Sequence, residues 1–443
     1  MTELWCELAW LGGEAAQPGV ALRVEEGRFA AVEPGVERPP AGAERLGGLT
    51  LPGLANAHSH AFQRALRGRT HAGRRDFWAW RDGMYALAER LDPELFLRLA
   101  RAAYAEMALA GITCVGEFHY LHHGPRGVPY ANPNELGEAA IAAAAEAGIR
   151  ITLLDACYLS GGFGSELAGA QLRFADASAA AWAERAGRLS PAAHARIGAA
   201  IHSVRAVDPA AAAAVADWAR ERGAPLHAHV SEQPAENERC LAAYGLTPAA
   251  VLDRAGALGE RFTAVHATHL ADADVGLLGS RSVTCCLCPT TERDLADGVA
   301  PARRLRDAGA SLALGTDSHA IVDPFEEARA VELDQRLVTG ERGHHSPAEL
   351  LEAASAAGHR CLGWPEAGRI EPGALADLVT LGLDSARLAG SDPASAPAAA
   401  VFAASAADVR SVMVGGEWVV RDGRHARLDA AGELEAAVRE AWA

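Results

Sequence analysis

The sequence contains no lysine, so all 41 basic residues are arginines. This absence excludes mechanisms that need an amine side chain, such as Schiff-base formation, a phosphate-binding loop lysine or a carboxylated lysine between two metals. Concentrated basic stretches are also missing, and the formal net charge is −16. We therefore expect no nucleic-acid partner and no membrane partner, because phosphate backbones and anionic membranes both attract a basic surface.

Long apolar runs are absent too, and residues 1–13 lack the basic and apolar segments of a secretion signal. Outside the cluster at 285–288, the eight cysteines show no CxxC pair, and none shows disulfide-like spacing, which indicates a reducing, cytoplasmic location. Cys285, Cys286 and Cys288 form one cluster in an apolar run. That setting favours buried thiols on a strand over soft metal ligands.

Short apolar or β-branched runs alternate with Ala/Leu/Glu-rich stretches of helical period from about residue 50 onward. This alternation predicts βαβ units and a parallel sheet, and eight such runs favour a (β/α)8 barrel of the TIM type. A doubly wound open sheet is the alternative, but no glycine-rich phosphate fingerprint follows the first run. The expected strands cover residues 49–54, 112–119, 150–158, 196–203, 225–230, 262–267, 282–288 and 311–317.

Both ends of the chain contain short β segments punctuated by glycine, which predict a small β-sandwich domain into which the barrel is inserted. We expect residues 1–50 to form the first part of this domain and residues 51–366 to form the barrel. Residues 367–443 would complete the small domain and end in a helix, with Gly415-Gly416 as a hairpin turn. Within the barrel, Asp92 is a plausible N-cap for a helix over 93–110.

Histidines and an aspartate fall where the expected strands end, the rim at which barrel enzymes build their active sites. His58 and His60 share one face after the first strand, His229 ends the fifth strand, and Asp317 ends the eighth. Three imidazoles and a carboxylate suit one divalent metal ion, with Zn²⁺ favoured and Fe²⁺ or Mn²⁺ as alternatives. Such an ion would ionise a water molecule near neutral pH.

Two acidic or basic groups beside these ligands could move protons. Glu232 lies three residues after His229, close enough to reach over the metal without binding it. Burial would raise the pKa of Glu232 and let it carry a proton to a leaving nitrogen, whereas a solvated loop carboxylate is the alternative. His266, at the end of the sixth strand, or Asp317 would take the proton from water.

Together these motifs resemble the mononuclear deaminases of the amidohydrolase superfamily, over nearly the whole chain. Within that superfamily, five strings are similar to the formimidoylglutamate deiminase family: HSHAFQRA (58–65), FWAWRD (77–82), EFHY (117–120), HSVRAV (202–207) and SEQ (231–233). This resemblance implies hydrolysis of N-formimino-L-glutamate to N-formyl-L-glutamate and ammonia, a reaction of histidine degradation.

The implied substrate is small and anionic, with two carboxylates, and Arg81 and Arg205 are candidate bidentate donors to them. The resemblance adds Gln63, Tyr120 and His202 as hydrogen-bonding groups around the substrate, and analogy alone suggests a homodimer. The tryptophan-rich segment 77–84 could be a lid or part of the core.

Two rival functions remain open. A deaminase that acts on a heterocyclic ring would favour aromatic stacking over paired arginines. A non-catalytic barrel scaffold would have lost turnover, although the presence of all four expected ligands and Glu232 argues against it.

Overall fold

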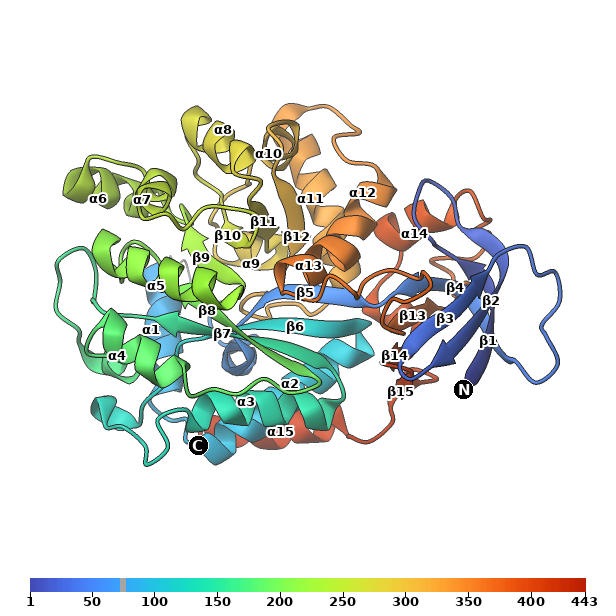
Figure 1. Ribbon diagram of the computed structural model, residues 1–443, viewed down its shortest axis with the longest axis horizontal. Coiled ribbons are helices and arrows are strands. Elements are labelled where there is room, and N and C mark those ends of the chain that lie inside the picture. Colours follow the sequence, from blue (N-terminus) through green and yellow to red (C-terminus); the bar gives the residue numbers. More distant parts are fainter. Residues whose placement is uncertain (72–76) are drawn as a thin grey trace.

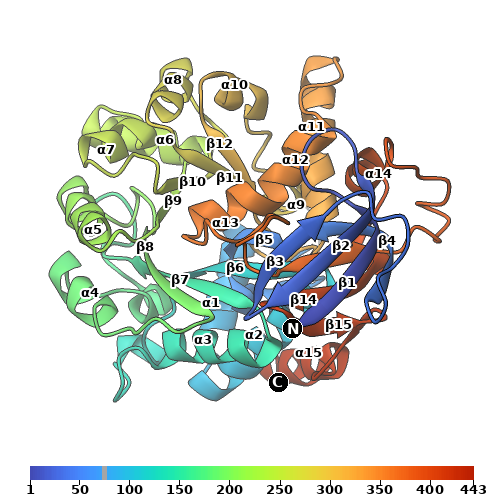
Figure 2. The same ribbon diagram turned by 45° about the vertical axis from the view of Figure 1, so that its right-hand side comes forward.

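The structure is a computed structural model that describes residues 1–71 and 77–443, apart from the side chain of Trp78. Its centre is a parallel sheet of eight strands curled into a barrel and surrounded by helices (Figure 1 and Figure 2). The predicted (β/α)8 barrel is therefore confirmed. Its strands are β5 (Leu54–Ser59), β6 (Ile112–His119), β7 (Arg150–Cys157), β8 (Ala195–Ile201), β9 (Leu226–Val230), β10 (Phe262–His266), β11 (Thr284–Leu287) and β12 (Ser311–Leu314).

The barrel closes at its carboxyl-terminal mouth, where the end of β5 meets the chain that follows β12. The backbone N–H of Asp317 donates to the carbonyl of His58 at 3.0 Å, and the N–H of His60 donates to the carbonyl of Asp317 at 3.1 Å. The same backbone that joins the two edges of the sheet thus carries three of the four expected metal ligands.

Helices follow most of the barrel strands and cover the outside of the sheet (Figure 2). Helix α2 begins as expected, because Asp92 accepts the N–H of Leu95 at 2.8 Å and Pro93 occupies its first turn. In the part of the chain that the structure describes, no helix is both long and apolar enough to cross a membrane. The helices are α1 (Phe77–Ala88), α2 (Pro93–Leu109), α3 (Glu135–Ala147), α4 (Ala179–Ala186), α5 (Pro209–Arg222), α6 (Pro234–Tyr244), α7 (Pro248–Arg254), α8 (Asp272–Ser280), α9 (Pro289–Asp294), α10 (Ala302–Asp307), α11 (Pro324–Thr339), α12 (Pro347–Glu352), α13 (Gly358–Cys361), α14 (Ala396–Phe402) and α15 (Ala430–Ala441).

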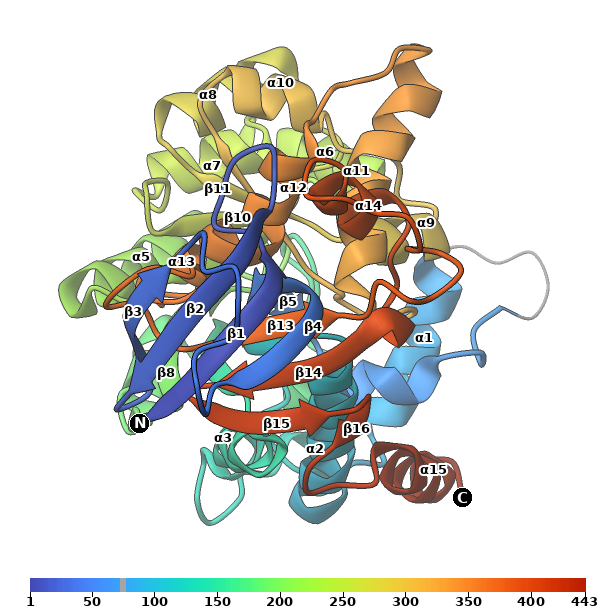
Figure 3. The ribbon, with the colours of Figure 1, turned by 90° about the vertical axis from the view of Figure 1, so that its right-hand side faces the viewer.

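The two chain ends together build the small β domain, as predicted (Figure 3). Antiparallel pairing of Thr50 on β4 with Thr380 on β13 joins the first part of this domain to the second. All eight of its strands belong to one mixed sheet, and the boundaries at residues 50 and 366 stay a prediction. The strands are β1 (Thr2–Ala9), β2 (Gln17–Glu25), β3 (Arg28–Glu33), β4 (Glu44–Pro52), β13 (Leu378–Leu381), β14 (Val409–Val414), β15 (Glu417–Arg421) and β16 (Arg424–His425).

Two predicted strands are corrected by the structure. The sequence predicts a first barrel strand over 49–54, but β4 ends at Pro52 in the small domain and β5 begins at Leu54. Proline has no N–H to donate, and the next N–H, that of Gly53, bonds to the carbonyl of Asp377 at 2.9 Å, so the run is divided there. His58 consequently lies within β5. The eighth strand, predicted over 311–317, ends at Leu314, so Asp317 lies beyond the end of β12.

A buried ion pair links the barrel to the small domain. Arg150, the first residue of β7, donates from Nε to Oδ2 of Asp377 at 3.0 Å and from Nη2 to Oδ1 at 2.9 Å. Asp377 is fully buried, and its Oδ1 also accepts the N–H of Gly415 at 2.6 Å. This bidentate pair fixes the small domain at the end of the barrel opposite its mouth.

Candidate active site

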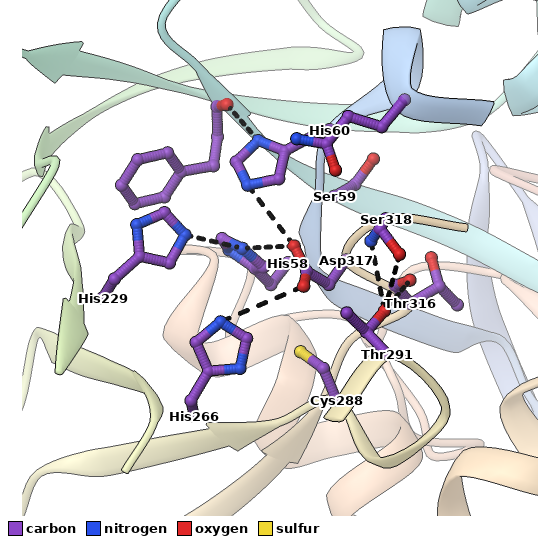
Figure 4. A network of polar contacts seen from close by, with 12 residues as sticks. His58, Ser59, His60, His229, His266, Cys288, Thr291, Thr316, Asp317 and Ser318 are labelled. Atoms are coloured by element: carbon purple, nitrogen blue, oxygen red, sulfur yellow. Dashed lines mark hydrogen bonds and ion pairs between the residues drawn. The ribbon is translucent and has the colours of Figure 1, made fainter. Parts of the chain in front are cut away.

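Four histidines and one aspartate meet at the carboxyl-terminal ends of the barrel strands (Figure 4). Nε2 of His58 lies 3.2 Å from Oδ1 of Asp317, and Nε2 of His60 lies 3.4 Å from the same oxygen. His229 places its Nε2 3.2 Å from Nε2 of His58, and His266 places its Nε2 3.9 Å from Oδ2 of Asp317. All five side chains are buried.

The hydrogen bonds behind these rings show which nitrogen of each ring faces the centre of the cluster. Nδ1 of His60 lies 2.9 Å from the carbonyl of Phe118, and Nδ1 of His229 lies 2.8 Å from the carbonyl of His202. Because a carbonyl only accepts, both Nδ1 atoms carry the hydrogen, and both Nε2 atoms present a lone pair to the centre.

Lone pairs that face a carboxylate repel it unless a cation lies between them. Burial lowers the pKa values of His58, His60 and His229, so these rings are neutral and can act as metal ligands. Burial would raise the pKa of Asp317, but the neighbouring histidines, His58 first, hold it well below its usual range, so its carboxylate is charged. This donor set fits a divalent metal ion.

The structure brings all four predicted metal ligands together, and His266 lies among them. The ligand atoms of His58, His229, His266 and Asp317 lie within 4.8 Å of one another, a set that does not include His60. Nε2 of His60 nevertheless lies 3.4 Å from Oδ1 of Asp317. A three-histidine, one-aspartate cluster is therefore present, and the choice of His60 over His266 as ligand stays a prediction.

Glu232 lies at the edge of the cluster, beside His266. Its Oε1 is 3.9 Å from Nε2 of His266, and it is buried. Burial raises the pKa of Glu232, and His266 and Arg205 oppose that effect. Ser231, His266 and Asp317 all have positive φ angles, of 53°, 69° and 43°, which non-glycine residues adopt at a cost and which are frequent at active sites.

Two buried glutamates that the sequence analysis did not assign hold the cluster in place. Oε1 of Glu292 lies 3.3 Å from Nδ1 of His266 and accepts the N–H of Cys288 at 2.9 Å. Glu117 accepts the hydroxyl of Ser59 at 2.7 Å and the N–H of Ala61 at 2.8 Å, which fixes the chain on both sides of His60. The signal that could have found them is position, since Glu117 lies near the end of β6 and Glu292 lies in α9, the helix that follows β11. The cysteines near β11 are buried free thiols, as predicted.

One cavity opens above the cluster, and every predicted substrate-binding residue lines it. Nε2 of Gln63 donates to the hydroxyl of Tyr120 at 2.8 Å. Helix α1 supplies Arg81, and its aromatic residues Phe77 and Trp80 also face the cavity, so the tryptophan-rich segment covers the site. The predicted residues that line the cavity are Gln63, Arg81, Tyr120, His202 and Arg205.

Arg205 lies between two buried carboxylates without a short hydrogen bond to either. Its Nη2 is 3.7 Å from Oε2 of Glu232, and its Nε is 3.9 Å from Oε1 of Glu236. Among the described residues, its one hydrogen bond runs from Nε to Oγ of Ser203 at 3.4 Å. The end of the guanidinium group is therefore free to bind a further anion in the cavity.

Comparison with known proteins gives the same picture as the geometry. Residues 49–419 match the amidohydrolase family. A formimidoylglutamate deiminase from Pseudomonas aeruginosa is 40% identical over 87% of this chain and 87% of the relative. A 5-methylthioadenosine/S-adenosylhomocysteine deaminase from Natronomonas pharaonis is 32% identical over 89% of this chain and 86% of the relative.

Two crystal structures share the fold over nearly their whole length. An amidohydrolase from Brucella melitensis has a TM-score of 0.91 and 32% identity, with full coverage of both chains. An adenosine deaminase from Xanthomonas campestris with bound zinc has a TM-score of 0.83 and 25% identity, over 99% of this chain and 97% of the neighbour. These matches confirm the resemblance drawn from the motifs. The chain belongs to the amidohydrolase family and is a hydrolase that acts on carbon–nitrogen bonds.

Proposed function

We propose that the protein hydrolyses N-formimino-L-glutamate to N-formyl-L-glutamate and ammonia. The observation that carries this proposal is a single cavity that contains the histidine–aspartate cluster together with Arg81 and Arg205. An amidine with two carboxylates offers one carbon for hydrolytic attack and two anions for guanidinium groups. The deiminase relative from Pseudomonas aeruginosa supports the same substrate.

His58, His60, His229 and Asp317 would hold one divalent ion. The nitrogen and oxygen donors favour Zn²⁺, as does the zinc-bound neighbour, with Fe²⁺ or Mn²⁺ as alternatives. When bound, such an ion supplies the Lewis acidity that ionises water near neutral pH. Asp317 accepts the proton that the attacking water releases. Burial would lower the pKa of His266, but the carboxylates around it, Glu232 first, raise that pKa well above its usual range, so its ring is protonated and supports the charge of Asp317.

Glu232 would complete the reaction by giving a proton to the leaving nitrogen. Addition of water oxygen to the formimino carbon makes a tetrahedral carbon that carries two nitrogens. Protonation of the terminal nitrogen by Glu232 lets the carbon–nitrogen bond break, so ammonia leaves. The hydroxyl group on the same carbon gives its proton back to the Glu232 carboxylate as the carbonyl of the formyl group forms. Arg205, 3.7 Å from Glu232, binds a substrate carboxylate and keeps the amidine near that acid.

An ammonia-release assay on N-formimino-L-glutamate, beside adenosine and 5-methylthioadenosine, tests the proposed substrate. We expect activity on the amidine alone, and we expect Arg205→Ala to raise KM about tenfold or more because it removes a charged hydrogen-bond partner of a carboxylate. Arg188→Ala, which changes an exposed arginine on the outside of the barrel, serves as the matched control. Release of ammonia from a purine nucleoside alone, or an unchanged KM in Arg205→Ala, would contradict the proposal.

Glu232→Gln tests the acid. The amide cannot donate the proton that makes ammonia a leaving group, so we expect kcat to fall by about 100-fold or more. Metal analysis of the same preparation should show an unchanged content, since Glu232 is not a proposed ligand. Wild-type turnover in this variant would remove Glu232 from the mechanism.

A ring deaminase is the second candidate, and the aromatic lining of the cavity favours it. Trp80, Tyr85 and Tyr158 line the same cavity as the arginines and could stack on a flat base. The 5-methylthioadenosine/S-adenosylhomocysteine deaminase relative supports this alternative. In that case Arg81→Ala and Arg205→Ala would change KM little, and the panel above would show it directly.

A further inference from the structure

A buried glutamine side chain sets the direction of two phenol groups in the cavity. Oε1 of Gln171 accepts the N–H of Ala168 at 3.1 Å, so the oxygen of this amide must face that donor. Nε2 then points the other way, toward the carbonyl of Gly161 at 3.3 Å, which only accepts. Both contacts agree, and they fix which end of the amide is which.

The same Nε2 lies 3.2 Å from the hydroxyl of Tyr158 and 3.2 Å from the hydroxyl of Tyr85. An amide nitrogen donates and does not accept, so neither phenol can direct its own hydrogen at Gln171. Among the described residues, the hydrogens can go only to the other phenol oxygen or into the cavity. At least one O–H therefore points into the cavity as an unused donor.

These donors lie next to the arginines that the proposed function assigns to the substrate. Tyr158, Tyr85, Arg81 and Arg205 all line the cavity, and the guanidinium carbon of Arg81 is 5.3 Å from the ring centre of Tyr85. Burial raises the pKa of Tyr158, an effect that the nearby charge of Arg205 opposes only in part, so the phenol keeps its hydrogen at neutral pH. A carboxylate has about four acceptor positions, more than one guanidinium group fills.

We propose that Tyr158 and Tyr85, oriented by Gln171, complete with Arg205 one carboxylate-binding subsite that selects an anionic substrate. This inference rests on the proposed function for the identity of the substrate. Arg205 supplies the charge, and the phenols supply neutral donors that add no further positive charge to the cavity. Gln171 is a positioning residue, because it acts on the substrate only through the two phenols.

Steady-state kinetics on three substrates test this subsite. They are N-formimino-L-glutamate and its two monoamides, N-formimino-L-glutamine and the α-amide, each of which lacks one carboxylate. We expect the double variant Tyr85→Phe/Tyr158→Phe to raise KM for the parent substrate about tenfold or more, with kcat little changed. The penalty should vanish with one monoamide, the same one that abolishes the penalty of Arg205→Ala. Gln171→Met should show the same preference with a smaller rise.

Tyr244→Phe is the control for loss of a phenol hydroxyl, since Tyr244 lies outside the cavity lining. Melting temperatures of all variants check that the fold is kept. Equal penalties with both monoamides, or a penalty that follows the opposite carboxylate from Arg205→Ala, would overturn the subsite.

The subsite and the proposed reaction can fail separately. If the wild type releases no ammonia from any amidine, the proposed function fails, and calorimetric titration with N-formyl-L-glutamate then tests the subsite alone. Weaker binding by the double variant than by the wild type would support it. Equal binding by the two proteins, or no binding by the wild type, would overturn it.

Discussion

Asp377→Asn is expected to destabilise the protein through the ion pair between barrel and small domain. Asparagine keeps the shape of the side chain and can still accept the N–H of Gly415, but it leaves the charge of Arg150 uncompensated. Removal of one partner of a buried pair costs about 3–5 kcal/mol. The two hydrogen bonds of 2.9 and 3.0 Å and the complete burial of Asp377 argue for the full effect here.

The size of the expected shift in melting temperature follows from the chain length. An unfolding entropy of about 2.1 cal/mol/K per residue gives roughly 0.9 kcal/mol/K for 443 residues, so a loss of about 4 kcal/mol lowers Tm by about 4 °C. The shift is larger if the small domain melts by itself, because its fewer residues have a smaller unfolding entropy. Differential scanning calorimetry measures both cases, and kcat at 25 °C should be unchanged because the pair lies away from the barrel mouth.

An exposed ion pair provides the control for Asp377→Asn. Arg188 pairs with Glu184 on the surface, where the side chains are 59% and 71% exposed, so Arg188→Ala should shift Tm by less than about 1 °C. A melting temperature for Asp377→Asn within about 1 °C of the wild type would refute the reasoning. It would show that Arg150 finds water or another acceptor when its partner is lost.

Two further predictions concern the metal centre and acid stability. Gly315→Ala would place a Cβ 2.8 Å from Cβ of His58, so we expect displaced His58, less bound metal by elemental analysis and about tenfold or more lower kcat/KM; full metal content would contradict this. Burial would raise the pKa of Asp155, yet Arg185 lowers it to about 2, so this carboxylate stabilises the fold above pH 3.8 and loses its effect as pH falls through about 2. The free energy of unfolding of Asp155→Asn should therefore be about 2–3 kcal/mol lower than that of the wild type above about pH 5, and the difference should shrink toward pH 2. Thermal melts over this pH range measure it, and a difference independent of pH would count against the reasoning.

The sequence predicted the barrel well because its strands are buried on both faces. Strand β6, for example, has the predicted bounds Ile112–His119. The first strand was misplaced because residues 49–54 form one apolar run on both sides of Pro52, and only the fold shows that the chain passes from one sheet to another there. Periodicity cannot show which of two adjoining buried sheets a strand joins.

Some residues of the candidate site can be found from sequence motifs, and others only from the contacts that they make in the fold. His58, His60, His229 and Asp317 belong to short strings of distinctive composition, so they could be found one by one. Glu292, Glu236, Tyr158 and Gln171 carry no such string, and their importance follows from what they touch. Gln171 in particular lies in a short 3-10 helix, Gly169–Arg173, whose place beside the cavity depends on tertiary contacts.

The backbone contact between His58 and Asp317, which closes the barrel, also bears on the order in which the barrel can form during synthesis. A ribosome releases the chain from its N-terminus, so His58 on β5 and His60 just after it emerge long before the aspartate that follows β12. Until Asp317 arrives, the nascent sheet has two open edges and only part of the donor set. The full set of proposed metal ligands is therefore assembled only when the last strand docks against the first.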